Sequence, residues 1–214
     1  MKLDTYLRSS IADQVLECLQ IAYPLSRAEL RGSLRDGSAD AYSDIDIFWE
    51  VPDEIFMEAS NNLPDILSEV RGIRSFRSDP DFQNSEKRRL IFVQFKDLPL
   101  FWRVDIEIFA ESIQGDREYD LDNKAARGDD WSFTYSALMN AIAAIKAIHR
   151  DKENVARGLL ERAYERVSLE TPESQPFEMI LALTQRISSM EQESSDLANE
   201  IERVVYDLWE NRAG

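Results

Sequence analysis

The chain has 214 residues, of which 41 are acidic and 25 are basic, so its formal net charge at pH 7 is −16. The length suits one large domain or two small ones, and one cysteine excludes an internal disulfide. Affinity for nucleic acid depends mainly on Lys and Arg that neutralise phosphates, so this charge disfavours a nucleic-acid partner and favours a cationic ligand. No window reaches the roughly 18 apolar residues of a membrane span. Without a secretory pattern at the start, we expect a cytoplasmic protein that does not bind membranes.

The first part of the chain mixes helical and extended patterns. In chain order we expect a helix over 4–22, strands over 26–31 and 44–51, a helix over 53–71 and a strand over 72–76. Pro64 is expected to begin a second piece of the 53–71 helix. Residues 78–87 are expected to form a loop, and the basic run Lys87–Arg89 a solvated start to the apolar run that follows.

Residues 101–109 alternate cleanly between apolar and polar side chains. Val104, Ile106 and Ile108 share one face, and Arg103, Asp105 and Glu107 share the other. Because successive side chains of a strand point to opposite faces, this pattern predicts a half-buried strand with two carboxylates on its polar face.

Residues 111–130 are polar and without an apolar period, so we expect a domain boundary there, with domains over 1–113 and 131–214 and a linker over 114–130. The sequence pattern after residue 130 is typical of helices. Helices are expected from 131 to 149, 152 to 168, 177 to 192 and 195 to 211. The sequence thus predicts an α+β fold, in which a first domain with strands and helices precedes a C-terminal helical bundle.

Small and acidic residues converge around the second predicted strand. Gly32-Ser33 follows an apolar approach, and Asp44 and Asp46 stand two residues apart beyond a ten-residue spacer. Residues two apart in a strand point to the same side, and two neighbouring carboxylates repel unless a cation lies between them. A hard divalent cation with oxygen ligands is the expected partner. The Gly-Ser turn adds backbone N–H groups and a hydroxyl suited to phosphate.

The Gly32-Ser33…Asp44-Ile45-Asp46 pattern resembles the signature of the DNA-polymerase-beta-like nucleotidyltransferases. The string Gly32-Ser33-Leu34, Asp40 and Tyr42–Ile45, and the strand around Asp105, resemble the kanamycin nucleotidyltransferase branch. The likeness is specific over about 30–50 and 101–113. It implies a mixed sheet flanked by helices and transfer of a nucleoside monophosphate, AMP above all, from ATP or another NTP to a hydroxyl, with release of pyrophosphate.

The resemblance also implies roles for individual residues. Asp44, Asp46 and Asp105 would bind two Mg²⁺ ions, and Asp105 would also serve catalysis. Gly32, Ser33, Arg31 and Arg35 would hold the triphosphate. Glu161, in the helical half, would be the general base, with His149 as the other conceivable base and Glu107 as a further acid of the site. The relatives pair as dimers, so a homodimer is compatible with this interpretation.

Three functions stay open from the sequence. The first is transfer to a small, hydroxylated and cationic acceptor such as an aminoglycoside, with antibiotic resistance as one physiological role. The second is attachment of AMP to a partner protein, as in antitoxin-type nucleotidyltransferases, and the third is a non-catalytic nucleotide-binding relative. Polymerase or RNA-tailing activity is the weakest of the readings, because of the charge of −16.

Overall fold

The structure is a computed structural model that describes residues 3–212, with side chains described up to Leu208. It divides between Trp131 and Ser132 into two compact units, here called the first unit and the helical unit. The segment 114–130, proposed from the sequence as a linker, falls within the first unit. It is bonded there to the loop that contains Asn84, whose side-chain amide donates to the Arg127 carbonyl at 2.6 Å.

The first unit is built on a five-stranded sheet in the order β1-β2-β5-β4-β3. The strands are β1 (Arg27–Arg31), β2 (Ile45–Val51), β3 (Ile73–Ser78), β4 (Arg88–Phe95) and β5 (Val104–Ala110). β2 and β5 run parallel, and the other neighbours are antiparallel. The expected α+β fold with a mixed sheet and a helical C-terminal part is therefore confirmed.

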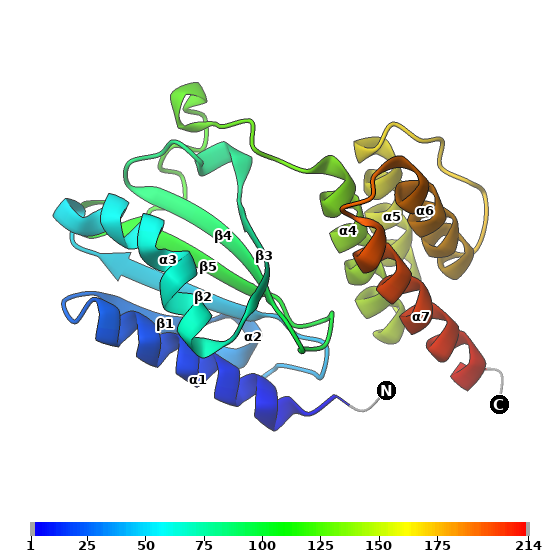
Figure 1. Cartoon of the computed structure of the whole chain (residues 1–214), viewed down its shortest axis with the longest axis horizontal. Helices are drawn as coiled ribbons and strands as arrows, with labels where there is room; N and C mark the ends of the chain where they lie inside the picture. The colour runs from blue at the N-terminus through cyan, green and yellow to red at the C-terminus, as the bar shows by residue number, and fades with distance from the viewer. Residues whose placement is uncertain (1–2, 213–214) are drawn as a thin grey trace. The chain divides into compact units, whose positions relative to one another are not determined.

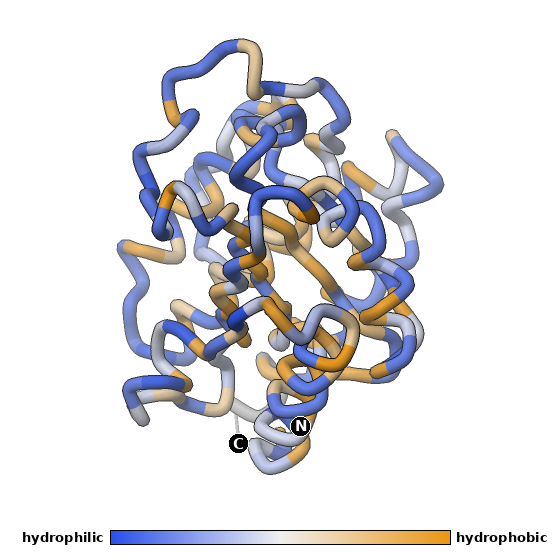
Figure 2. The backbone as a smooth tube through the Cα atoms, turned by 90° about the vertical axis from the view of Figure 1, so that its left-hand side faces the viewer, coloured by the Kyte–Doolittle hydropathy of each residue, from blue (hydrophilic) through white to orange (hydrophobic). Residues whose placement is uncertain are grey.

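Two helices, α1 (Thr5–Ala22) and α3 (Phe56–Val70), cover one face of this sheet (Figure 1). The Asp4 carboxylate begins α1 by accepting the Tyr6 N–H at 3.0 Å. The core between helices and sheet contains fully buried side chains from both layers: Ile11, Val15, Leu19, Leu63, Leu67, Ile45, Trp49, Val104, Ile106 and Ile108. In Figure 2, long orange (hydrophobic) stretches run through the middle of the trace, and the loops at its edges are mostly blue (hydrophilic).

α3 is continuous through Pro64, so the expected break into two pieces is wrong. A proline inside a helix removes one backbone hydrogen bond and costs about 3 kcal/mol or more. Here Leu63 and Leu67, on either side of the proline, are fully buried against the sheet. Burial of these side chains holds the helix together where local propensity alone would end it.

The basic run at the start of β4 is largely buried, so the expected solvated start is wrong for Arg88 and Arg89, which are 5% and 8% exposed. The Arg89 guanidinium donates to the Phe82 carbonyl at 2.8 Å. Arg88 stacks over the Phe82 ring, 3.9 Å from its centroid. Backbone carbonyls and aromatic faces thus replace water around these two cations.

Short elements connect the longer ones. They are α2 (Gly32–Arg35) and the 3₁₀ turns η1 (Asp53–Ile55), η2 (Pro80–Phe82), η3 (Glu111–Ile113) and η4 (Lys124–Ala126). Over residues 3–212, no helix combines the length and apolar character needed to cross a membrane.

The helical unit contains four helices, α4 (Phe133–His149), α5 (Glu153–Arg166), α6 (Pro176–Met190) and α7 (Ser195–Arg212), close to the expected ranges. Trp131 lies before α4 rather than in it, and the Ser132 hydroxyl begins that helix by accepting the Tyr135 N–H. The bundle interior is apolar, with Leu138, Ile142, Ile145, Leu160, Ile180, Leu183 and Ile201 buried.

Asp53 joins the ends of two strands and makes stability depend on pH. Its carboxylate accepts the Ser112 hydroxyl at 2.6 Å and the Ser112 N–H at 2.9 Å, and lies 3.1 Å from the Lys87 ammonium. The bonds from Ser112, assisted by Lys87, lower the pKa of Asp53 to about 2. A lowered pKa stabilises the fold above the unfolded-state value near 4 and ceases to do so as pH falls through about 2.

We therefore expect Asp53→Ala to melt slightly below the wild type at pH 5–6, with the difference shrinking between about pH 4 and pH 2. Thermal melting of both proteins at steps of half a pH unit measures this difference in melting temperature. A difference in melting temperature that stays constant down to pH 2 would contradict the role of the Asp53 charge.

Candidate active site

A row of five side chains crosses the sheet on the face opposite the α1–α3 core, here called the polar face. The register pairs Arg31 with Asp46, Asp46 with Asp105, Asp105 with Phe92, and Phe92 with Arg77. Cross-strand partners project to the same side of a sheet. All five side chains are half-buried. The sheet thus places two aspartates side by side at its centre and an arginine at each end of the row.

Asp46 and Asp105 are direct neighbours on the parallel strands β2 and β5, which lie about 5 Å apart in such a pair. Their core-side neighbours, Ile45 and Ile106, are fully buried and fix the direction of both carboxylates. The pair lines a cavity of about 340 Å³ together with Gly32, Phe92, Glu107 and other residues of the polar face. Two carboxylates at this spacing require a nearby cation.

Arg103 supplies a cation within the chain. Its Nε and Nη2 each donate to one oxygen of Asp105 at 2.5 Å, and its backbone N–H donates to Asp44 Oδ1 at 3.1 Å. Burial alone would lower the pKa of the Arg103 guanidinium, but Asp105, followed by Asp44 and Asp46, outweighs it and raises that pKa. One arginine therefore faces all three acids that the sequence singles out.

Gly32 lies directly against the acidic pair. Its φ is +57°, and a Cβ at this position would lie 2.5 Å from Asp46 Oδ2. Both the left-handed backbone and the close approach require glycine here. Glycine at the first residue of α2 therefore lets the backbone pass directly against the Asp46 carboxylate, where a side chain would clash.

We expect Gly32→Ala to displace the Asp46 carboxylate while leaving the fold intact. The left-handed conformation costs about 1–2 kcal/mol for a residue with a Cβ, and the clash acts on the end of one side chain. Titration calorimetry should show a clear loss of affinity for divalent cations, whereas the melting temperature should fall only slightly. Gly37→Ala is the matched control, because Gly37 has a φ of +70° with nothing near its Cβ position.

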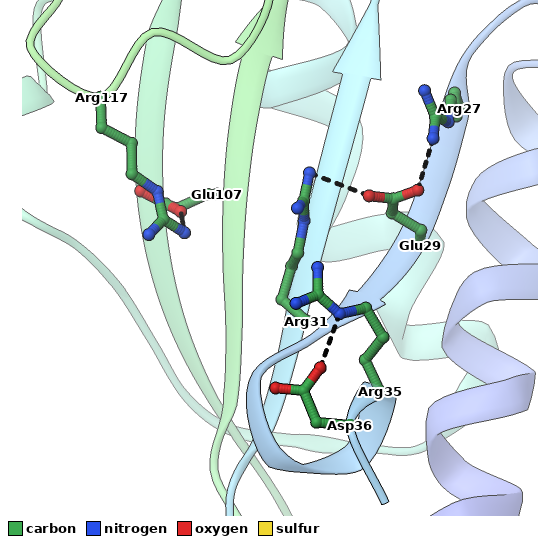
Figure 3. A network of polar contacts seen from close by, with 7 residues as sticks. All are labelled: Arg27, Glu29, Arg31, Arg35, Asp36, Glu107 and Arg117. Carbon is green, nitrogen blue, oxygen red and sulfur yellow. Dashed lines mark hydrogen bonds and ion pairs between the residues drawn. The ribbon is translucent and has the colours of Figure 1, made fainter.

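A second cavity of about 320 Å³ adjoins the first and carries three arginines, Arg31, Arg35 and Arg117. Figure 3 shows that each has an acidic partner at short range. Arg31 lies 2.9 Å from Glu29 and over the Phe48 ring, Arg35 lies 2.9 Å from Asp36, and Arg117 lies 2.6 Å from Glu107. Arginine forks of this kind suit phosphate oxygens.

Arg117 is a charged residue of both cavities that sequence reasoning missed. It comes from the segment 114–123, which carries no apolar period, and it lines both cavities. The buried Arg88 guanidinium fixes the segment 114–123 by donating hydrogen bonds to the carbonyls of Arg117 and Tyr119. Gly115, with φ of +71°, lets the backbone approach the Phe48 ring. In the sequence, the glycine at 115 followed by the basic residue at 117 was the feature that could have indicated a phosphate-binding loop.

The other residues named from the sequence lie as follows. Ser33, in α2, lines neither of these two cavities, and its carbonyl accepts the Ser38 N–H at 3.0 Å. Glu161 is exposed on α5 of the helical unit, and His149 is the last residue of α4. Roles for Glu161 and His149 in catalysis stay predictions.

The chemistry of the donor set suits a hard cation, because Asp44, Asp46 and Asp105 offer only carboxylate oxygens. Among the side chains that the structure describes, however, no three acidic, His or Cys residues are arranged to hold a metal ion. Asp105 turns both oxygens to Arg103 instead. The residues fit a divalent cation provided that Asp105 can be released from this arginine.

Comparison with known proteins gives likeness in structure only. No protein-family model matches the chain, and no curated protein matches it. Among solved structures, a GLD-2/RNP-8 complex matches with 10% identity, TM-score 0.39, and coverage of 84% of this chain and 76% of that one. A cytoplasmic RNA terminal U-transferase matches with 17% identity, TM-score 0.36, and coverage of 72% and 38%. The polymerase core of TRAMP, an RNA surveillance complex, matches with 11% identity, TM-score 0.37, and coverage of 98% and 59%.

At such identities and TM-scores the likeness decides nothing about activity. The chain spans well under half the length of the U-transferase it matches. Two of these descriptions name RNA, as the substrate of a terminal U-transferase and as the object of a surveillance complex, and none of the three names the kanamycin branch. The ground for a function is therefore the geometry of this chain's own polar face.

Proposed function

We propose that this chain is a metal-dependent nucleotidyltransferase that moves a nucleoside monophosphate from an NTP, ATP above all, to an acceptor hydroxyl and releases pyrophosphate. One observation carries the proposal: Asp46 and Asp105 are register neighbours on parallel strands, in a cavity beside Gly32. The Gly-Ser…Asp-x-Asp spacing in the sequence and the third acid on the next strand support it together.

Each residue has a task in this reaction. Asp46 and Asp105, with Asp44, are proposed to hold two Mg²⁺ ions, which when bound stabilise charge on the attacking and leaving oxygens. Arg31, Arg35 and Arg117 are proposed to bind the phosphates that leave, by exchanging their acidic partners for phosphate oxygens. Gly32 keeps space for a phosphate beside Asp46, with Ser33 in the same turn. Catalysis then rests on positioning and charge.

The acceptor is proposed to be a small hydroxylated molecule, and a cationic one. The net charge of −16 supports this choice, because it attracts cations and repels an RNA backbone. Glu161 is the proposed general base, which would take the proton of the attacking hydroxyl. A homodimer and a cytoplasmic location belong to the same proposal.

The experiment is pyrophosphate release measured with Mg²⁺ and each of the four NTPs, against three kinds of acceptor. These are a panel of aminoglycosides and other amino sugars, an RNA oligonucleotide with a free 3′ hydroxyl, and the host lysate followed by mass spectrometry for nucleotide adducts on proteins. Calorimetry with Mg²⁺ and a non-hydrolysable ATP analogue measures binding separately.

Turnover with an amino sugar supports the proposal in full. Turnover with RNA or a protein alone keeps nucleotidyl transfer and overturns the small acceptor. Binding of Mg²⁺ and the analogue without any turnover points to the non-catalytic relative, and absence of both binding and turnover overturns the proposed function.

A further inference from the structure

We propose that Arg103 is the counter-cation of the acidic cluster in the metal-free protein, and that a divalent cation binds only by displacing it from Asp105. This inference rests on the proposed function for its second half. The first half rests on contacts within the chain alone.

The geometry of Arg103 suits a cation that saturates its partner. The guanidinium donates to both Asp105 oxygens at 2.5 Å, which is the bidentate arrangement that gives the strongest arginine–carboxylate pairs. The two side chains are 24% and 17% exposed, so water screens them only in part. An oxygen engaged in this way is not free to be a metal ligand.

The position of Arg103 also ties it to the other two acids. Its backbone N–H is bonded to Asp44, and the Ile45 N–H is bonded back to its carbonyl at 2.9 Å, so β5 and β2 begin side by side. Asp46 is the direct register neighbour of Asp105. A charge at Arg103 is therefore felt by every carboxylate assigned to metal binding.

The guanidinium has a second contact on the polar face, made at the same time as its bonds to Asp105. Arg103 lies over the Phe92 ring, 4.7 Å from its centroid, and Phe92 is the register partner of Asp105 on β4. The ring can retain the guanidinium by a cation–π contact after the carboxylate is released. Replacement of Arg103 by a divalent cation at Asp105 then requires a change of the Arg103 rotamer rather than a movement of the strand.

The first experiment tests the counter-cation without metal. In EDTA, Arg103→Gln removes the guanidinium from its half-buried pair with Asp105, next to Asp46, so the melting temperature should fall by several degrees more than in Arg127→Gln. That control removes the same charge from an exposed pair with Asp81. The double variant Arg103→Gln/Asp105→Asn should recover part of the loss. Additive losses in the double variant would overturn the counter-cation role.

The second experiment measures Mn²⁺ affinity by calorimetry and by electron paramagnetic resonance. Arg103→Gln should bind Mn²⁺ at least about fivefold tighter than the wild type, a coupling of ordinary size, while Arg127→Gln stays unchanged. Equal or weaker binding by Arg103→Gln overturns the displacement. If no variant binds Mn²⁺ while the melting temperatures couple as expected, the metal in the proposed function fails and the counter-cation role stands.

Discussion

Asp46→Asn should lower turnover with NTP and acceptor about 10³-fold while the fold is kept. A divalent cation held by Asp46 would supply several kcal/mol of stabilisation to charge in the transition state, and each 1.4 kcal/mol is a factor of ten in rate. Asparagine keeps the shape of aspartate, so Ile45 and Ile47 on the core side are undisturbed. Initial rates of pyrophosphate release measure the effect on turnover, the melting temperature measures the effect on stability, and calorimetry measures the effect on Mg²⁺ affinity.

Glu50→Gln is the matched control for this prediction. Glu50 lies four residues along the same strand on the same face, in register with Arg27, and lines neither of the two cavities. It should keep the wild-type rate. An equal loss of turnover in both variants would show a general effect of charge on the sheet. Full activity in Asp46→Asn would show that Asp46 has no role in the reaction.

Strand alternation was enough to predict which side chains share the polar face of β5, since Arg103, Asp105 and Glu107 are half-buried and Val104, Ile106 and Ile108 are buried. Alternation cannot give register between strands distant in sequence. The pairing of Asp46 with Asp105 depends on how β2 and β5 align, and 58 residues separate the two strands' acids, with β3 and β4 between them. Only the folded sheet supplies that alignment.

Tertiary contacts decide the outcome at Arg88 and Pro64, two residues that sequence reasoning misjudged. Arg88 is buried because the carbonyls of Arg117 and Tyr119 accept hydrogen bonds from its guanidinium, and no local sequence pattern predicts such acceptors. Pro64 stays inside α3 because Leu63 and Leu67 pack on the sheet. The Arg103–Asp105 pair, two residues apart on one strand face, was available to sequence reasoning, because residues i and i+2 are neighbours there.

Ile106→Ala should destabilise the first unit by about 2–5 kcal/mol, the cost of a large-to-small change in a packed core. Ile106 is fully buried on β5, in register with Ile47 on one side and Ile91 on the other. It is also the residue after Asp105, so the scaffold under the site loosens with it. Because the chain forms two units, a single global unfolding curve mixes both. Hydrogen exchange of the β2 and β5 amides, followed by mass spectrometry, measures the first unit directly.

Ile21→Ala is the control of the same residue type, because Ile21 on α1 is 70% exposed and buries little on folding. It should leave exchange of the β2 and β5 amides within about 0.5 kcal/mol of the wild type, as surface substitutions do. Ile106→Val should fall between the two, at about 0.5–1.5 kcal/mol, because it removes one methylene rather than three carbons. If Ile106→Ala and Ile21→Ala accelerated exchange equally, β5 would not be the centre of the core, and the rigid support that brings Asp105 beside Asp46 would be absent.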